Sequence, residues 1–189
     1  VFLMSGNLLD KLLLMRELKF EPGKISLLQH RSFMATIAVI NSIALYMDQH
    51  PDSIAPIYLG MKNMHKDIWG DTLKKLYHLA PNEYLQKMFE LSSPLGWGTS
   101  ELLKYDDKET EGIFRTYDAP VGSSFKGKFK YPAEHFWRAI TAGTGVSIFN
   151  KEIDVIETKC IAHGESYCEF IFMPVEKAVL SKDKYPYQF

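Results

Sequence analysis

The residues with the clearest capacity for chemistry are the two cysteines of the chain, Cys160 and Cys168, which lie in one short stretch near its C-terminal end. Glu157 comes three positions before Cys160, and His163 lies between the cysteines. Two soft sulfur ligands with a carboxylate and an imidazole nearby suit Zn²⁺ in a tetrahedral site. The same thiols could instead form a cross-strand disulfide or serve as small buried apolar side chains.

The segments on either side of these cysteines are typical of two β-strands. Residues 153–161 are rich in Ile, Val and Thr, residues 167–172 are rich in aromatic side chains and Ile, and Gly164 lies between them. Glycine accepts the positive φ of a tight connection, so the pattern predicts a hairpin. If the hairpin is symmetric about Gly164, Cys160 pairs with Cys168, with Cβ atoms about 4.5–5.5 Å apart.

Glu157 reaches the same face only under a further condition. Residues three apart in a regular strand point to opposite sides of the sheet. A β-bulge or a sharp twist between Glu157 and Cys160 would bring the carboxylate to the cysteine side.

The motif E-x-x-C-x-x-x-G-x-x-x-C, which begins at Glu157 and is followed by aromatic residues, resembles the signature of the 4-vinyl reductase domain family. This family includes effector-sensing domains of phenol- and xylene-responsive activators, and its superfamily includes core subunits of the TRAPP tethering complex. The resemblance implies a structural zinc ion held by Glu157, Cys160, Cys168 and a cysteine about two dozen residues upstream.

That upstream cysteine is absent from this chain. The corresponding segment, residues 131–137, offers His135 or Glu134 as a substitute. We take His135 as the expected fourth ligand, with Glu134 and His163 as alternatives.

The composition is that of an ordinary globular protein. The 189 residues include 46% apolar and 24% charged residues, with a formal net charge of −1. This predicts one domain over residues 1–189, without the basic patch expected for direct nucleic-acid binding. No apolar run approaches the roughly 20 residues of a membrane span, no signal peptide is recognised, and two cysteines make no disulfide scaffold, so a cytoplasmic location is expected.

The order of the expected elements indicates an α+β fold, with an antiparallel four-stranded sheet packed against helices and a C-terminal zinc-type hairpin. Residues 1–30 are expected to form an N-terminal dimerisation and hairpin segment, with a turn at Pro22-Gly23, and residues 177–189 an arm or frayed end. Residues 8–18 are expected to form a short helix or the lead-in to a strand. Before the C-terminal hairpin we further expect helices over residues 34–49, 53–79, 81–91 and 134–149, strands over 99–105 and 113–119, and a loop over 120–130.

No enzyme motif is present. The chain lacks Gly-x-Ser-x-Gly, a dinucleotide-binding Gly-x-Gly-x-x-Gly after a strand, and His-Glu-x-x-His. His50 and His65 are interpreted as helix-end or surface residues. We therefore expect no enzymatic activity, despite the name of the family that the motif resembles.

The twelve Phe, ten Tyr and three Trp residues are consistent with a large core or with an apolar ligand pocket. The resemblance implies a pocket between the sheet and the helices, and we name Trp97, Phe114 and Trp137 as candidate wall residues. The segment 93–97 lacks the histidine expected from the phenol sensors, which favours a ligand more apolar than phenol, such as a hydrocarbon or a lipid-like chain.

The sequence thus predicts a non-enzymatic sensor or binding domain for a small hydrophobic or aromatic ligand. It would be a cytoplasmic homodimer with a structural zinc ion, and it would act through a regulatory protein partner. One alternative is a dimeric scaffold similar to a TRAPP subunit, and another is an accessory protein or reductase in tetrapyrrole metabolism.

Overall fold

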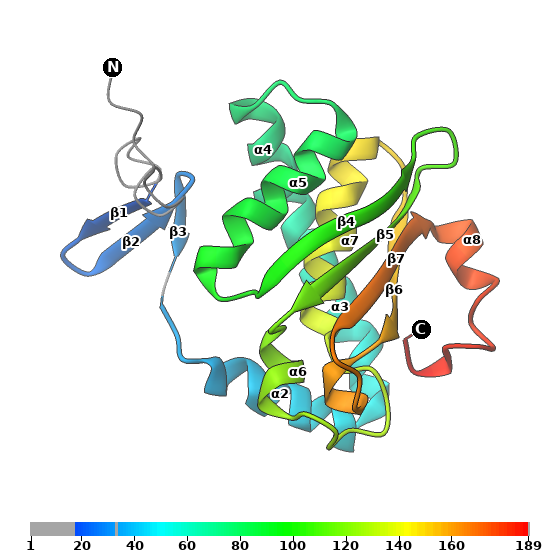
Figure 1. Ribbon diagram of the computed structural model, residues 1–189. Helices are drawn as coiled ribbons and strands as arrows, with labels where there is room; N and C mark the ends of the chain where they lie inside the picture. The colour runs from blue at the N-terminus through cyan, green and yellow to red at the C-terminus, as the bar shows by residue number, and fades with distance from the viewer. Residues whose placement is uncertain (1–17, 33, 189) are drawn as a thin grey trace.

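The computed structural model describes residues 18–32 and 34–188, and its centre is a four-stranded antiparallel sheet (Figure 1). The strands lie in the order β4–β5–β7–β6. Their bounds are Thr99–Asp106 for β4, Glu111–Tyr117 for β5, Ile153–Lys159 for β6 and Cys168–Pro174 for β7. The predicted α+β class and the four-stranded antiparallel sheet are confirmed.

Helix α7 (His135–Phe149) is the central helix of the fold, because almost every one of its side chains is buried. It packs on β6 and on α3 (Ile54–His65) behind the sheet, as Figure 1 shows. A side chain at Gly143 would collide with the backbone of Lys62, so glycine allows the two helices to approach closely.

The single helix expected over residues 53–79 is interrupted. Helix α3 ends at His65, a π-helical turn η2 spans Lys66–Gly70, and α4 covers Asp71–Leu76. A side chain at Gly70 would overlap that of Ser147 on α7, and the Ser147 hydroxyl donates to Asp71 Oδ1 at 2.6 Å. The chain therefore changes from α-helical to π-helical geometry where it contacts α7. Helix α5 (Pro81–Ser92) begins and ends close to its predicted bounds.

Helix α2 (Ile37–Gln49) is apolar but mostly exposed. Of its residues only Ala44 and Met47 are buried, whereas Ile37 is 42% and Val39 47% exposed. Apolar residues at positions 37, 40, 43, 44 and 47 follow the three-and-four spacing that is typical of a buried helix face. The spacing was correct for the residues at 44 and 47, but the outer part of the helix has little of this chain to pack against.

A separate three-stranded sheet precedes α2, and Figure 1 shows it beside the main body, joined by an extended segment. It comprises β1 (Leu18–Glu21), β2 (Lys24–Leu27) and β3 (His30–Ser32). Its first turn contains Gly23 at φ +72°, as predicted from Pro22-Gly23. The short helix or lead-in to a strand expected over residues 8–18 lies outside the described residues, apart from Leu18, which begins β1.

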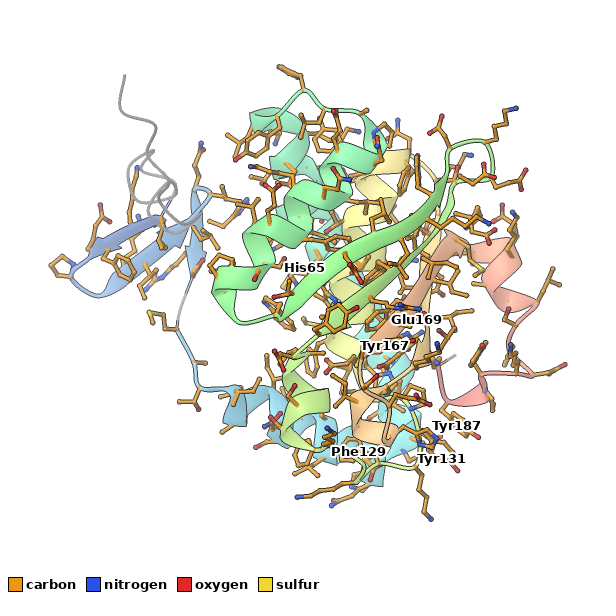
Figure 2. All side chains as sticks on the ribbon, viewed as in Figure 1. His65, Phe129, Tyr131, Tyr167, Glu169 and Tyr187 are labelled. Atoms are coloured by element: carbon orange, nitrogen blue, oxygen red, sulfur yellow. The ribbon has the colours of Figure 1, made fainter. Side chains whose placement is uncertain are left out.

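Two other expectations are corrected. The loop predicted over residues 120–130 begins with a short helix, α6 (Pro120–Ser124), whose first residues are buried. The tail predicted as an arm or frayed end forms α8 (Val175–Val179) and a 3-10 turn, η5 (Pro186–Gln188), and returns to the body. Tyr187 stacks on Tyr131 with ring centroids 3.5 Å apart. Both residues are labelled in Figure 2.

Among the described residues, no helix combines the length and the apolar character needed to cross a membrane.

Candidate functional site

A β-bulge on β6 brings Glu157 to the cysteines. Glu157 pairs with Phe170, and Lys159 pairs with the neighbouring Glu169, so Thr158 is an extra residue in the ladder. The insertion shifts the side-chain alternation by one position. The condition that the sequence placed on Glu157 is therefore met by a bulge.

The two cysteines approach each other by a less regular route than predicted. Cys160 follows the end of β6 and lies outside the strand ladder, a 3-10 turn spans Ile161–His163, and Gly164 has φ +113°. Cys168 begins β7, opposite Thr116 of β5. Lys159 pairs with Glu169, so the register beside the turn is symmetric about Gly164 as predicted, and both cysteines are free, buried and close together.

The three motif side chains form one cluster with the geometry of a metal site. Ligand atoms of Glu157, Cys160 and Cys168 all lie within 4.8 Å of one another. All three residues are 0% exposed. The backbone N–H of Ile161 also donates to Cys168 Sγ at 3.4 Å.

A second buried carboxylate borders this cluster. Glu134, at the N-terminal end of α7, is 0% exposed, and its Oε1 accepts from the Gly122 N–H at 2.6 Å. A Cβ placed at Gly122 would lie 3.3 Å from both Glu134 Oε1 and Cys168 Sγ, so glycine leaves room for these two groups to face the same space.

The observation that best fits a cation site is the pair of carboxylate oxygens without partners among the described residues. Glu134 Oε2 and Glu157 Oε1 are buried and accept no hydrogen bond from the described residues. Buried polar atoms are nearly always paired, and an unpaired carboxylate oxygen is costly. The donor set of two thiols and two carboxyl groups fits a divalent cation with mixed sulfur and oxygen ligands.

The pKa values of the cluster are shifted by burial and by the proximity of its acidic groups. Burial, followed by the charge of Glu157, raises the pKa of Glu134 to about 8. Burial and the adjacent Cys160 raise the pKa of Glu157 well above its usual value. The hydrogen bond from Cys168 lowers the pKa of the Cys160 thiol to about 7, and the same bond with burial raises that of Cys168.

The two histidines considered as ligands lie elsewhere. His135 is the first residue of α7, and its Nδ1 lies 3.2 Å from Arg138 Nη1. Burial and the charge of Arg138 lower the pKa of His135 to about 3. His163 is exposed in the turn, with Nδ1 3.3 Å from the carbonyl of Phe129. Neither belongs to the group of mutually close ligand atoms, whereas Glu134, named from the sequence only as an alternative, borders it.

The three candidate wall residues do not lie around one cavity. Phe114 and Trp137 are 0% exposed in the core, where Trp137 Nε1 donates to Thr116 Oγ1 at 2.9 Å. Trp97 stacks on Trp137 with centroids 5.7 Å apart and is partly buried. Trp97 also lines a cavity, together with neighbouring residues of the turn after α5.

That cavity has a volume of about 630 Å³ and lies between the N-terminal sheet, α2 and the turn η3 (Ser93–Leu95). Its walls are mainly apolar and include Phe20, Leu27, Ile40, Leu95 and Trp97. A second cavity, of about 260 Å³, lies on the other side of β2 and β3 and is lined by His65.

The burial of His65 was not predicted from the sequence, where this histidine was interpreted as a helix-end or surface residue. It is 8% exposed, at the end of α3. A signal was present: Ile54, Tyr58, Lys62 and His65 follow one another at spacings of four, four and three, which place them on one helix face. All four are buried.

No family model matches the sequence, and no curated protein matches it. Among solved structures, the phenol-responsive sensory domain of the transcription activator PoxR with phenol matches with a TM-score of 0.72 and 18% identity, covering 94% of this chain and 98% of that chain. A vinyl-4-reductase family protein from Methanocaldococcus jannaschii matches with a TM-score of 0.49 and 20% identity, covering 76% and 83% of the two chains.

A trafficking protein particle complex subunit 3 from Naegleria fowleri, covalently bound to palmitic acid, matches with a TM-score of 0.41 and 11% identity, covering 73% of this chain and 94% of that chain. The resemblance predicted from the C-terminal motif is therefore confirmed as a shared fold: this chain folds like the PoxR phenol-sensing domain.

Proposed function

We propose that this chain is a single-domain, non-enzymatic binding domain for a small hydrophobic or aromatic molecule, stabilised by a structural zinc ion. It acts in the cytoplasm as a homodimer and passes its signal to a regulatory protein partner. The proposal is supported by the fold shared with the PoxR sensory domain and by the cavities beside the N-terminal sheet.

The observation that carries the ligand-binding part is the apolar cavity of about 630 Å³. Ligand sites in proteins are mostly apolar clefts of about 300–1,000 Å³ with few polar groups. Trp97 on the wall stacks on Trp137, which is held by Thr116, so an occupant would contact a fixed aromatic surface. This suits a hydrocarbon or aromatic body.

For the zinc ion we propose Glu157, Cys160, Cys168 and Glu134 as ligands. Four protein ligands make a closed site, which is typical of a structural metal, and zinc would join β6, β7 and α7. The pair of unpartnered carboxylate oxygens supports Glu134 over His135, whose ring nitrogen already faces Arg138. The metal supplies positive charge in a cluster of acidic groups.

The homodimer is proposed from the exposed apolar face of α2. Large side chains such as Tyr46, 51% exposed, lie on this face, and Leu59 of α3 is 52% exposed. Exposed apolar area of this extent is typical of an interaction surface. The same face supports the alternative of a dimeric scaffold, in which the partner rather than a small ligand defines the role.

Binding of the neutral fluorescent probe N-phenyl-1-naphthylamine tests the ligand-binding proposal. We expect a saturable rise in fluorescence with the native chain. Ile40→Trp fills the large cavity and should weaken binding at least about tenfold. Leu180→Trp, on an exposed position outside both the cavity and the proposed dimer surface, serves as the matched control and should leave affinity unchanged.

Absence of saturable probe binding, or equal affinity in both variants, would favour the scaffold. In that case the oligomeric state should still respond to a charged substitution on α2, such as Tyr46→Glu.

A further inference from the structure

The C-terminal turn η5 contacts a proposed metal ligand directly through its last residue, Gln188. The Gln188 side-chain amide accepts from the Glu157 N–H and donates to the Glu157 carbonyl, both at 2.8 Å. Gln188 is 3% exposed, so water has little access to these two bonds. The amide therefore fixes the backbone of the residue whose carboxyl group lies beside Cys160 and Cys168.

This restraint acts where strand β6 is irregular. The next residue, Thr158, is the extra residue of the β-bulge, and a bulge locally disrupts the hydrogen bonds of the ladder. A rotation of the backbone at Glu157 would move its carboxyl group, of which Oε2 accepts from the Glu134 N–H at 3.0 Å. Gln188 thus holds the orientation of a ligand that its own strand holds less firmly.

Arg138 connects the same turn to helix α7. The residue is 0% exposed, and its guanidinium donates to the Val155 carbonyl at 2.7 Å and to the Gln188 carbonyl at 3.0 Å. Its backbone N–H donates to the Glu134 carbonyl at 3.0 Å, one helical turn earlier. One buried side chain thereby joins η5, the strand that carries Glu157 and the start of α7 beside Glu134.

The charge of Arg138 suits a metal held by this set of ligands. Two thiolates and two carboxylates carry twice the charge of one Zn²⁺ ion, and excess charge inside a protein is costly unless it is compensated. Arg138 forms no ion pair with a carboxylate in the described part of the chain. Its positive charge is therefore available to offset that of the ligands.

The neighbouring residue of η5 contacts the other segment that carries a carboxyl group of the site. Tyr187 stacks on Tyr131, three positions before Glu134, with ring centroids 3.5 Å apart (Figure 2). Consecutive residues of the turn thus contact the approach to α7 and strand β6. A change in the separation of these two segments would disturb the fit of η5.

We propose that Gln188 positions Glu157 for metal binding, and that docking of residues 186–188 and occupancy of the metal site strengthen each other. The metal would hold β6 and α7 at the separation that η5 bridges, and η5 would hold the Glu157 carboxyl group in its ligand orientation. This inference rests on the proposed zinc ion and adds a role for the C-terminal segment.

Competition with a chromophoric chelator on the full chain measures one half of this coupling. Gln188→Ala removes both bonds to Glu157 and should weaken zinc binding about 10–100-fold, the range typical of groups that orient a metal ligand. Tyr187→Ala leaves the amide in place and should weaken zinc binding by a smaller factor. Gln86→Ala, at an exposed position of α5, is the control and should bind zinc like the native chain.

Hydrogen exchange at the Gln188 side-chain amide of the native chain measures the other half. The N–H that donates to Glu157 exchanges when η5 opens, and bound zinc should slow this exchange. The slowing should level off once the site is filled, at the factor by which Gln188→Ala weakens zinc binding, because coupling between two sites is reciprocal. General stabilisation of the fold would instead keep growing with zinc concentration.

Two results would overturn the inference. One is a zinc affinity of Gln188→Ala within about twofold of the native value, in a variant whose circular dichroism spectrum is native. The other is exchange at the Gln188 amide that zinc leaves unchanged. Either result, with zinc bound to the native chain, would leave the proposed metal site standing and remove only the coupling. Absence of zinc binding by the native chain would overturn both.

Discussion

The backbone N–H of Glu134 donates to Glu157 Oε2 at 3.0 Å, and this bond joins the start of α7 to the bulged strand β6. Each of the two buried carboxyl groups then has one oxygen with a backbone donor and one oxygen without a partner. A single cation shared between the two free oxygens and the two sulfur atoms would satisfy the cluster. The predictions for the metal follow from this arrangement.

Glu134→Gln should weaken zinc binding more than about 100-fold, because loss of a ligand costs more than the 10–100-fold typical of outer-shell changes. The native chain should contain one zinc ion per chain, and Cys168→Ser should contain none. Competition with a chromophoric chelator measures the affinity. His135→Gln is the control; if it loses the metal while Glu134→Gln keeps it, the proposed ligand set is wrong.

Deletion of Thr158 should retain metal binding, because it removes the bulge together with the extra residue and leaves Glu157 on the cysteine side of the sheet. Without the extra residue, Glu157 and Cys160 are two positions apart in a regular strand, and residues two apart point to the same side of the sheet. Metal content by plasma mass spectrometry checks this. Thr158→Ala keeps the bulge and removes only the hydroxyl, which donates to the Glu169 carbonyl at 3.2 Å, so it should retain the metal.

The bulge illustrates how far the sequence could be interpreted. The spacing of Glu157 and the cysteines, with Gly164 between them, predicted a hairpin and made a bulge the condition for a shared site. The sequence could not place the extra residue, because Thr158 has no local feature that distinguishes a bulged position. It also could not choose between Glu134 and His135, since adjacent residues at a helix start point in different directions.

Gly143→Ala should destabilise the fold by about 1–3 kcal/mol, even though alanine ordinarily stabilises a helix relative to glycine. The added methyl group would meet the backbone of Lys62 and force α3 away from α7. Gly60→Ala is the matched control, because the space around it is open and a gain of about 0.5–1 kcal/mol is expected. Urea unfolding measures both, and equal effects would contradict the close helix contact.

The contribution of His65 to stability should fall as the pH decreases from about 6.5 to 4, opposite in sign to that of Glu134, whose pKa is raised to about 8. The pKa of His65 is lowered to about 4 in the folded protein, so the unfolded chain binds more protons over this range. The loss from His65 is of the order of 3 kcal/mol. His65→Gln should reduce the slope of unfolding free energy against pH, and the remaining slope includes His135, whose pKa is lowered to about 3. An unchanged slope would show that His65 titrates normally.

Two features of the fold were beyond the sequence for physical reasons. The periodicity of α2 predicts an apolar face, but the pattern does not state which molecule covers it, and this chain covers only the part around Ala44 and Met47. The polar composition of residues 177–189 predicts a frayed end. Tertiary contacts override it, because the stacking of Tyr187 on Tyr131 and the amide of Gln188 hold the segment.

The position of Gln188 has a consequence for the open edge of the four-stranded sheet. Strand β6 is at the edge of the sheet, and the Gln188 side chain accepts from the Glu157 N–H and donates to the Glu157 carbonyl, both at 2.8 Å. The amide thereby occupies the groups that another chain would use to extend the sheet. Arg138 reinforces this cover by donating to the Gln188 carbonyl at 3.0 Å. Residues 186–188 thus shield the edge of β6 against aggregation at the strand that carries Glu157.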